Sequence, residues 1–295
     1  MYGEIIKKIR KQKGFTQKEV YGNVVSKTFY SDFEKGKYTI SIEKFEGLLS
    51  NLGITYREFD YIRQEKQQSE ISHLTAEIDR LYNQGQFEAL YDLYETNHQH
   101  SYKEVRYLAI KAYLLVLITN TNFYKFSRQP FNEITAELEK AKRWTLLEIR
   151  LGKLVLLSVP EKSKDYSNKL FQRLLKELDV YQQYDKSLFF EEVGDLYFNR
   201  IQSLLVTHDI GLAKATLGDY GTIMAKSDHV HWLIQLKFMT ILVHLYFDYP
   251  SYDGQLQQFL KEAKKIPTSE TRFYEIIAQL HQEKALTYYT RYALS

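Results

Sequence analysis

The segment from Lys27 to Lys37, which reads KTFYSDFEKGK, contains side chains suited to two different kinds of chemistry. Its three aromatic side chains would be expected inside the core of a small helical domain. Its lysine, threonine, serine and aspartate side chains carry donors and acceptors that could contact the base edges and phosphates of DNA. The segment is therefore either a buried helix or a helix that reads DNA.

The charge around this segment is uneven. The whole chain of 295 residues has a formal net charge of +3, but residues 1–68 alone contain 13 Lys+Arg against 9 Asp+Glu, a net charge of +4. The excess is concentrated in lysines and one arginine before residue 19, which only Glu4 and Glu19 oppose. Such asymmetry favours an anionic partner, and the alternative is a solvated helix face.

The rest of the composition excludes several classes. There is no cysteine, so disulfides, thiolate zinc sites and cysteine nucleophiles are excluded, as is typical of a reducing cytosol. Apolar runs such as 113–118 are far shorter than a membrane span, and no signal-peptide pattern is present. The four prolines lie between segments of helical periodicity. We expect a soluble, cytoplasmic, all-α protein that does not bind membranes.

No pattern points to catalysis. Neither a phosphate-binding GxxxxGK loop nor a dinucleotide-binding GxGxxG motif occurs. His229 and His231 form a close histidine pair, but they lack a third ligand in helical register. We therefore expect no enzyme activity, no cofactor and no metal.

Local signals predict three short helices in the first 36 residues. The apolar stripe of Ile5, Ile6 and Ile9 indicates a first helix that ends near Gly14. The sequence TQKE at 16–19 is a capping box, which predicts a second helix from there to about residue 21. Ser26 is suited to cap a third helix that ends at residue 36, with Phe29 or Tyr30 and Phe33 directed inward.

Two more helices are predicted before residue 62. The fourth is indicated by Ile42, Phe45, Leu48 and Leu49, and the sequence TYRE at 55–58 caps the fifth. Five short helices with a tight turn between the second and third follow the helix-turn-helix plan.

Several separate positions resemble the lambda-repressor-like (Cro/C1, XRE) helix-turn-helix family over residues 2–60. Arg10 and Glu34 resemble the pair that ties the first and third helices together in that family. Gln17 opens the second helix, as in the family, and the FEKG phrase at 33–36 and the LGI and EF phrases at 52–54 and 58–59 also agree.

This resemblance implies that the third helix enters the major groove of DNA. The positions that it matches to base reading are Lys27, Thr28, Ser31 and Asp32. The positions matched to phosphate contacts are Gln17, Lys35, Lys37 and Tyr38. Arg10 is a candidate for phosphate contact as well as for the pair with Glu34, and the aromatic residues 29, 30 and 33 are expected in the core.

The remainder of the chain is predicted to be a helical repeat array. Residues 1–62 are assigned to the helix-turn-helix domain, 63–70 to a polar helical linker and 71–295 to the repeats. Long apolar helices are expected to begin near Tyr102, Thr145, Leu188, His231 and Thr271. Their companions are expected to begin near Phe87, Phe131, Leu170, Leu212 and Leu256. A period of about 43 residues indicates a tetratricopeptide-like α-solenoid with long helices.

A few polar residues interrupt the long apolar helices of this array, namely Arg150, Asn199, Arg200 and Lys237. An arginine in such a position is costly unless it faces water or an anion. The sequence leaves open whether these residues contact a ligand or form ion pairs within the chain.

The combination of the FEKGK ending, the sequence ISIEKF at 40–45 and the repeat domain resembles the Rgg/GadR/MutR regulators, which belong to the RRNPP group of peptide-sensing receptors. This resemblance implies a homodimeric transcription factor that binds a palindromic promoter site. It also implies that the repeat domain binds a short linear signalling peptide, a quorum-sensing pheromone, in its concave groove. Arg150 and Asn199 match the positions that hold a peptide carboxylate and the peptide backbone in that group. The alternative is a repeat scaffold that answers to a protein partner and binds no peptide.

The carboxy-terminal segment 273–294 keeps an apolar stripe at Ile276, Ile277, Leu280 and Leu286. No further repeat follows to cover it. It is therefore either part of a dimer interface or a cap on its own solenoid.

Overall fold

The structure is a computed structural model that describes residues 2–63, 67–119, 126–158, 163–227, 229–266 and 269–292. Every regular element in these ranges is a helix, so the expected all-α class is confirmed. The chain separates into two compact units, one of residues 1–86 with 100–108 and one of residues 87–99 with 109–295. Each unit is described by itself.

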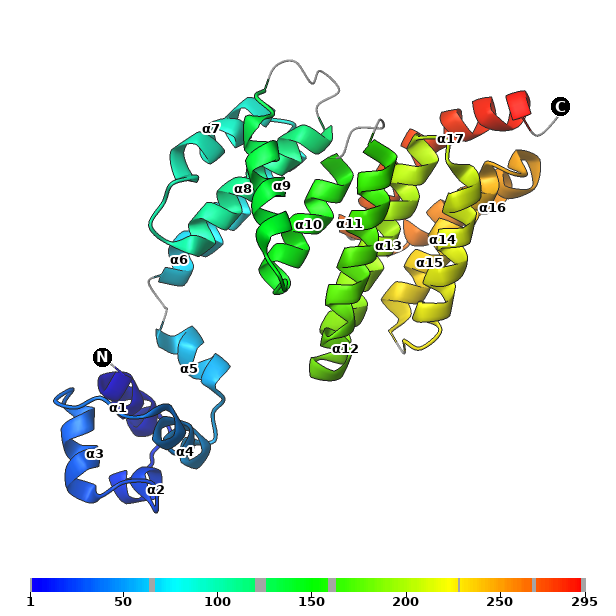
Figure 1. The fold of residues 1–295 in the computed structure, drawn as a ribbon. Coiled ribbons are helices and arrows are strands. Elements are labelled where there is room, and N and C mark those ends of the chain that lie inside the picture. The colour runs from blue at the N-terminus through cyan, green and yellow to red at the C-terminus, as the bar shows by residue number, and fades with distance from the viewer. Residues whose placement is uncertain are drawn as a thin grey trace. The chain divides into compact units, whose positions relative to one another are not determined.

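The first unit contains the five predicted short helices, drawn in blue in Figure 1: α1 (Tyr2–Gln12), α2 (Gln17–Tyr21), α3 (Lys27–Glu34), α4 (Ile42–Leu52) and α5 (Tyr56–Arg63). The predicted caps are confirmed. Thr16 and Glu19 form a complete capping box at α2. The Ser26 side chain accepts from the Phe29 amide at the start of α3, at 3.3 Å. At α5 the Thr55 amide donates to Glu58 at 2.7 Å.

Apolar side chains from all five helices form one core. Tyr30, Phe33, Phe45 and Phe59 are fully or almost fully buried in it, and Ile6 and Ile9 anchor α1. Two residues that were expected in the core are more exposed than predicted. Ile42 is 55% exposed, because it occupies the first turn of α4, where the helix faces solvent. Phe29 is only partly buried and packs against the edge of the core.

Helix α6 (Gln67–Asn83) belongs to the first unit, and α8 (Lys103–Thr119) is shared between the two units. Residues 64–66 of the predicted linker lie outside the described residues. The repeat-domain boundary at residue 71 stays a prediction.

The second unit consists of helical hairpins in series. Its further helices are α7 (Phe87–Asn97), α9 (Gln129–Lys140), α10 (Leu146–Ser158), α11 (Lys164–Asp179), the short α12 (Tyr181–Tyr184), α13 (Lys186–Val206), α14 (Ile210–Met224), α15 (Val230–Leu245), α16 (Tyr249–Ala263) and α17 (Ser269–Tyr292). The long helices α8, α10, α13, α15 and α17 begin within two residues of the predicted starts. The companions α11 and α16 begin six or seven residues earlier than predicted, because their first turns are mainly polar.

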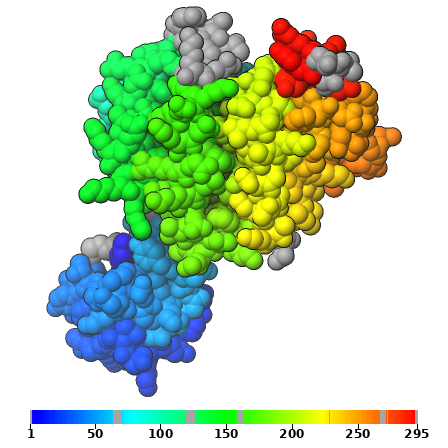
Figure 2. All heavy atoms as spheres, turned by 45° about the vertical axis from the view of Figure 1, so that its right-hand side comes forward, coloured from blue at the N-terminus to red at the C-terminus, as the bar shows by residue number. Residues whose placement is uncertain are grey.

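The long helices form one layer. Helices α10, α13, α15 and α17 contact one another in succession, and α9, α11, α14 and α16 each pack on a member of that layer. Figure 2 shows the green, yellow and orange surfaces of the second unit following one another in chain order, as expected of a repeat array. Helix α17 also contacts α13, where the rings of Phe198 and Phe273 lie 5.5 Å apart. The last helix therefore packs against two earlier members of the layer.

Helix α17 has one buried and one exposed face. Tyr274 and Ile277 are buried against the repeat layer, whereas Ile276, Leu280 and Leu286 are about half exposed. The helix acts as a cap on its own solenoid through the first face. The second face leaves an apolar stripe uncovered among the described residues.

Two tryptophans pack on glycines in this unit. A side chain added at Gly152 would come within 2.7 Å of the Trp144 ring, and one added at Gly194 within 2.8 Å of the Trp232 ring. Each indole therefore lies directly on helix backbone. A residue larger than glycine would force that helix and the ring apart.

Candidate nucleic-acid interface and ligand site

The first turn of α3 presents a lysine and a threonine to solvent. Lys27 and Thr28 directly follow the Ser26 cap, are exposed, and make no hydrogen bond or ion pair within the described part of the chain. Ser31, one turn later, is half-buried. These are the donors and acceptors that a helix-turn-helix domain places against base edges.

Asp32, the fourth predicted base reader, is engaged by neighbouring lysines. Helix α3 ends at Glu34, and Gly36, two residues later, has a positive φ of 76° that turns the chain back toward the helix. The Lys37 ammonium then lies 3.2 Å and the Lys35 ammonium 3.6 Å from the Asp32 carboxylate. The hydrogen bond from Lys37 lowers the pKa of Asp32 below its usual value. Asp32 can accept from a cytosine amino group only in competition with these lysines.

Arg10 and Glu34 form the predicted pair between α1 and α3. Arg10 Nε donates to Glu34 Oε1 at 2.6 Å, and its Nη2 donates to Oε2 at 3.1 Å. A third donor of the guanidinium bonds the Phe15 carbonyl at 3.0 Å. Only 11% of the Arg10 side chain is exposed. The pairing is confirmed, and this geometry favours a structural role for Arg10 over phosphate contact.

Gln17 is tied to the same carboxylate. Its amide nitrogen donates to Glu34 Oε2 at 2.8 Å. Burial would raise the pKa of Glu34, but the hydrogen bonds from Arg10 and Gln17 together hold that pKa below its usual value. Gln17 is thus held at the start of α2 by a charged acceptor, with its amide oxygen left for other contacts.

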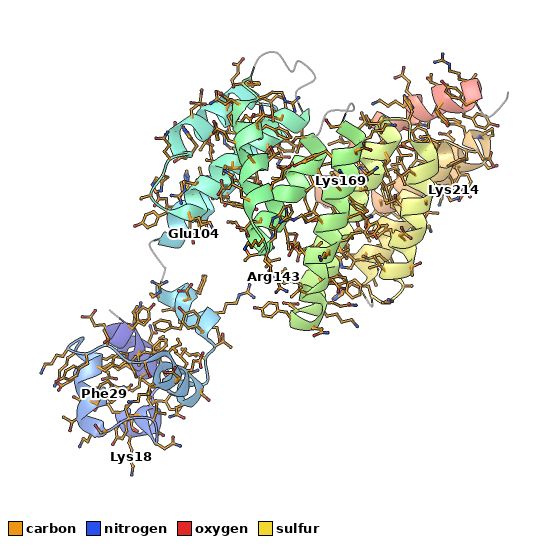
Figure 3. The ribbon with its side chains drawn as sticks, in the orientation of Figure 1. Lys18, Phe29, Glu104, Arg143, Lys169 and Lys214 are labelled. Atoms are coloured by element: carbon orange, nitrogen blue, oxygen red, sulfur yellow. The ribbon has the colours of Figure 1, made fainter. Side chains whose placement is uncertain are left out.

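The loop after α3 is braced by stacked aromatic rings. The rings of Tyr38 and Phe29 lie 5.7 Å apart and within 7° of parallel, and the Lys44 ammonium lies 6.0 Å from the Phe29 ring. Phe29 and the solvent-directed Lys18 are labelled in Figure 3. Sequence reasoning missed Lys44, whose only signal was its charge in the first turn of α4.

In the second unit, Arg150 belongs to an ionic cluster between α10 and α13. Its Nε donates to the buried Glu192 at 2.6 Å, and Lys153 lies 2.5 Å from the other oxygen of the same carboxylate. Lys153 also lies 3.4 Å from Asp195, whose pKa is raised by burial. The Arg150 side chain is still 46% exposed. It therefore forms an ion pair and also reaches solvent. Sequence reasoning missed Lys153, Glu192 and Asp195, which look like ordinary charges of a helix.

Asn199 and Arg200 are neighbours with different surroundings. Asn199 is half-buried and makes no side-chain hydrogen bond within the described residues. Arg200 is buried, donates to Ser167 Oγ at 2.5 Å and to Asn168 Oδ1, and lies over the Phe171 ring. Because Arg200 faces α11 and is occupied there, its placement favours an internal role over ligand contact.

Lys237 lies elsewhere again, in an open pocket of about 520 Å³ between α15 and α16. The pocket walls are mainly apolar, with Ile234 and Ile241 from α15 and Phe259 from α16. The four candidate ligand residues therefore have four different environments.

Two further classes of site are not found in the part of the chain that the structure describes. No group of three or more histidine, aspartate or glutamate side chains is placed to hold a metal ion there. Among the same residues, no helix is both long and apolar enough to cross a membrane.

The comparisons with known proteins agree with this architecture. Residues 6–59 match the helix-turn-helix family model. No curated protein sequence matches the chain. A solved structure described as a transcriptional regulator from Listeria monocytogenes EGD-e is similar over 96% of this chain and 97% of that chain, with a TM-score of 0.75 and 22% identity.

Two other solved structures are similar over almost the whole chain. The PrgX/iCF10 complex is matched over 96% of this chain and 89% of that chain, with a TM-score of 0.67 and 12% identity. The pheromone receptor Rgg2 from Streptococcus dysgalactiae is matched over 96% and 99%, with a TM-score of 0.67 and 19% identity. The chain thus carries a helix-turn-helix DNA-binding domain, as transcriptional regulators do, and its fold over almost the whole length is that of PrgX and Rgg2.

Proposed function

We propose that this chain is a transcriptional regulator that binds a specific promoter sequence as a homodimer and is controlled by a short linear peptide. The observation that carries the proposal is the joining of a helix-turn-helix domain to a helical-repeat unit with the fold of PrgX and of the pheromone receptor Rgg2. We propose no catalytic role, and a cytoplasmic location, where such a regulator meets DNA.

In the DNA complex, α3 lies in the major groove with Lys27 and Thr28 against base edges. Lysine suits the acceptors of guanine, and threonine can bond a base or contact a thymine methyl group. Lys35, Lys37 and Tyr38 lie just after the helix and are suited to phosphate contact. A domain of this size reads few base pairs, so a two-fold symmetric dimer on an inverted repeat supplies the remaining specificity.

The test of DNA binding uses duplexes selected from a random library by the wild-type protein. The double variant Lys27→Ala/Thr28→Ala is expected to lose about 1–3 kcal/mol of discrimination between selected and random duplexes. Arg57→Ala is the matched control, because it removes one exposed charge from the same domain. Unchanged discrimination in the double variant would reject this readout.

Arg150 is the residue best placed to capture a peptide carboxylate. It is half exposed, and its partner Glu192 is also held by Lys153 at 2.5 Å. Because a second cation stays beside Glu192, Arg150 can turn to a ligand without leaving a buried carboxylate unpaired. The half-buried Asn199, on the same helix as Glu192, can bond a peptide backbone.

The test of peptide binding uses calorimetry with peptides selected from a synthetic library by the wild-type chain. Arg150→Ala is expected to weaken binding of an acidic peptide by about 1–3 kcal/mol, as for a lost charge-assisted hydrogen bond. Lys169→Ala, at an exposed position on α11, is the control. Equal affinity in Arg150→Ala would remove Arg150 from the site.

The second candidate is a regulator that answers to a protein partner and not to a peptide. The exposed apolar stripe of Ile276, Leu280 and Leu286 on α17 favours it, since such a stripe fits a protein surface. In that case the library would give no binding peptide, while specific DNA binding would be retained.

A further inference from the structure

The pocket between α15 and α16 combines mainly apolar walls with the amino group of Lys237. We propose that it receives the carboxy-terminal residue of the peptide ligand: a large aliphatic side chain fills the pocket, and Lys237 binds the terminal carboxylate. The identity of the ligand as a peptide rests on the proposed function.

The pocket interior is apolar and open to a ligand. Ile241 is buried at its base, and Phe259 and Ala263 line its α16 side. At the rim, Ile266 is 69% exposed and Ile234 is 42% exposed. A volume of about 520 Å³ is in the range of small-molecule and peptide side-chain sites. An aliphatic occupant would remove these isoleucines from water, which is the main driving force for binding.

The charge at the rim is positive. Lys237 makes no ion pair or hydrogen bond within the described residues. Glu262, the one acidic lining residue, is already engaged: Lys265 lies 2.5 Å from its Oε2, and Gln258 donates to its Oε1 at 3.0 Å. The pocket therefore offers one uncompensated cation above an apolar base, which suits an aliphatic group that ends in a carboxylate.

Two glutamines distinguish a peptide from a simple fatty acid. The Gln255 amide nitrogen donates to the Ser251 carbonyl at 3.1 Å, and that of Gln258 donates to Glu262. Both amide oxygens have no partner within the described residues and can accept a hydrogen bond. A peptide end supplies N–H donors for them, whereas a fatty acid supplies none.

Gly254 allows the pocket to be filled by mutation. A Cβ added there meets no atom within 4 Å, and Gly254 lines the pocket, so Gly254→Leu is expected to place its side chain in the pocket. Gly218 on α14 also meets no atom within 4 Å and does not line the pocket, so Gly218→Leu is the matched control.

The experiment follows the isoleucine methyl signals of the full-length chain by NMR during titration with N-acetyl-Leu-Leu. We expect shifts at Ile234, Ile241 and Ile266. Conversion of the carboxylate to an amide is expected to weaken binding about tenfold, as is Lys237→Met in titrations with the free acid. Gly254→Leu abolishes the shifts, and Gly218→Leu leaves them unchanged.

Three results would overturn the proposal: no shift at these three residues, equal affinity for the acid and the amide, or octanoate binding as tightly as the dipeptide. The last result would assign the pocket to a fatty acid. If a selected peptide binds equally well to wild type and to Gly254→Leu, the pocket is not part of the peptide site, and the proposed function still stands. If the dipeptide binds at the pocket but the library selection yields no peptide, the assignment of the pocket stands and the proposed control by a peptide is rejected.

Discussion

The largely buried arginine of the helix-turn-helix domain and the buried arginine of the repeat unit have different kinds of partner. In the first, Arg10 is matched by a carboxylate, and Glu34 accepts from Arg10 and Gln17. In the second, the buried Arg200 donates to the neutral oxygens of Ser167 and Asn168, and burial lowers its pKa. The difference teaches that the two arginines are replaceable to different degrees. Loss of Arg10 leaves a buried carboxylate without its cation, whereas the two side chains that accept hydrogen bonds from Arg200 are neutral.

The largest effect is expected for Arg10→Ala, which should lower the free energy of unfolding of the helix-turn-helix domain by about 3 kcal/mol. The reason is that Glu34, which is 2% exposed, would keep its charge and lose its cation. Hydrogen exchange of the α1 and α3 amides measures this. The double variant Arg10→Met/Glu34→Leu, which leaves no unpaired charge, should recover most of the loss. A double variant as unstable as Arg10→Ala would contradict the explanation.

The next effect is a pH dependence confined to the repeat unit. His281 is fully buried, with Nδ1 2.8 Å from the Tyr246 hydroxyl, and burial together with Lys284 lowers its pKa to about 4. A neutral buried histidine binds fewer protons than the unfolded chain, so stability is full above about pH 6.5 and falls as the pH approaches 4. Between pH 7 and 5 the unit should lose about 2 kcal/mol.

Tryptophan fluorescence during urea unfolding reports this change, since both tryptophans of the chain, Trp144 and Trp232, lie in the repeat unit. His281→Gln should remove most of the pH dependence between 7 and 5. An equal slope in that variant would assign the dependence to other groups.

A smaller effect is expected for Arg200→Met. Methionine has a similar length and can keep the contact with Phe171, while Ser167 and Asn168 stay neutral. The free energy of unfolding should change by about 1 kcal/mol or less. The same fluorescence measurement applies, and a loss as large as that of Arg10→Ala would erase the contrast between the two regions.

The smallest effect on stability is expected for Arg150→Ala, within about 0.5 kcal/mol of wild type. Its side chain is half exposed, and Lys153 still neutralises Glu192. Thermal unfolding measures the change, and Lys153→Ala provides the comparison. Because Lys153 is buried beside two carboxylates, its removal should destabilise the unit clearly more than the removal of Arg150.

The elements could be predicted from sequence where their signals are local. The capping boxes at Thr16 and Thr55 each involve two residues only three positions apart, and both form as predicted. The repeat array was visible because its apolar pattern recurs at a nearly constant spacing. The Arg10–Glu34 pair spans 24 residues, and only the family resemblance indicated it.

The roles of single side chains were harder to predict where partners come from another helix. Nothing in the sequence around Arg200 indicates that Ser167 and Asn168, more than 30 positions earlier, receive its donors. The same holds for Glu192, which meets Arg150 from 42 positions away. Asp32 was expected to face DNA alone, but the turn at Gly36 brings Lys37 back to it. Such partners depend on how helices pack, which periodicity does not specify.

The tryptophans that lie on glycines also restrict how this repeat unit can change over time. Since a Cβ at position 194 would come within 2.8 Å of the Trp232 ring, position 194 cannot accept a larger residue while Trp232 is present. The two sites, 38 positions apart in sequence, are expected to vary together among descendants of this gene, with a bulkier residue at one accompanied by a smaller one at the other. Trp144 and Gly152 form a second such pair within a single hairpin. Covariation at these positions would record the packing of neighbouring repeats in the sequences themselves.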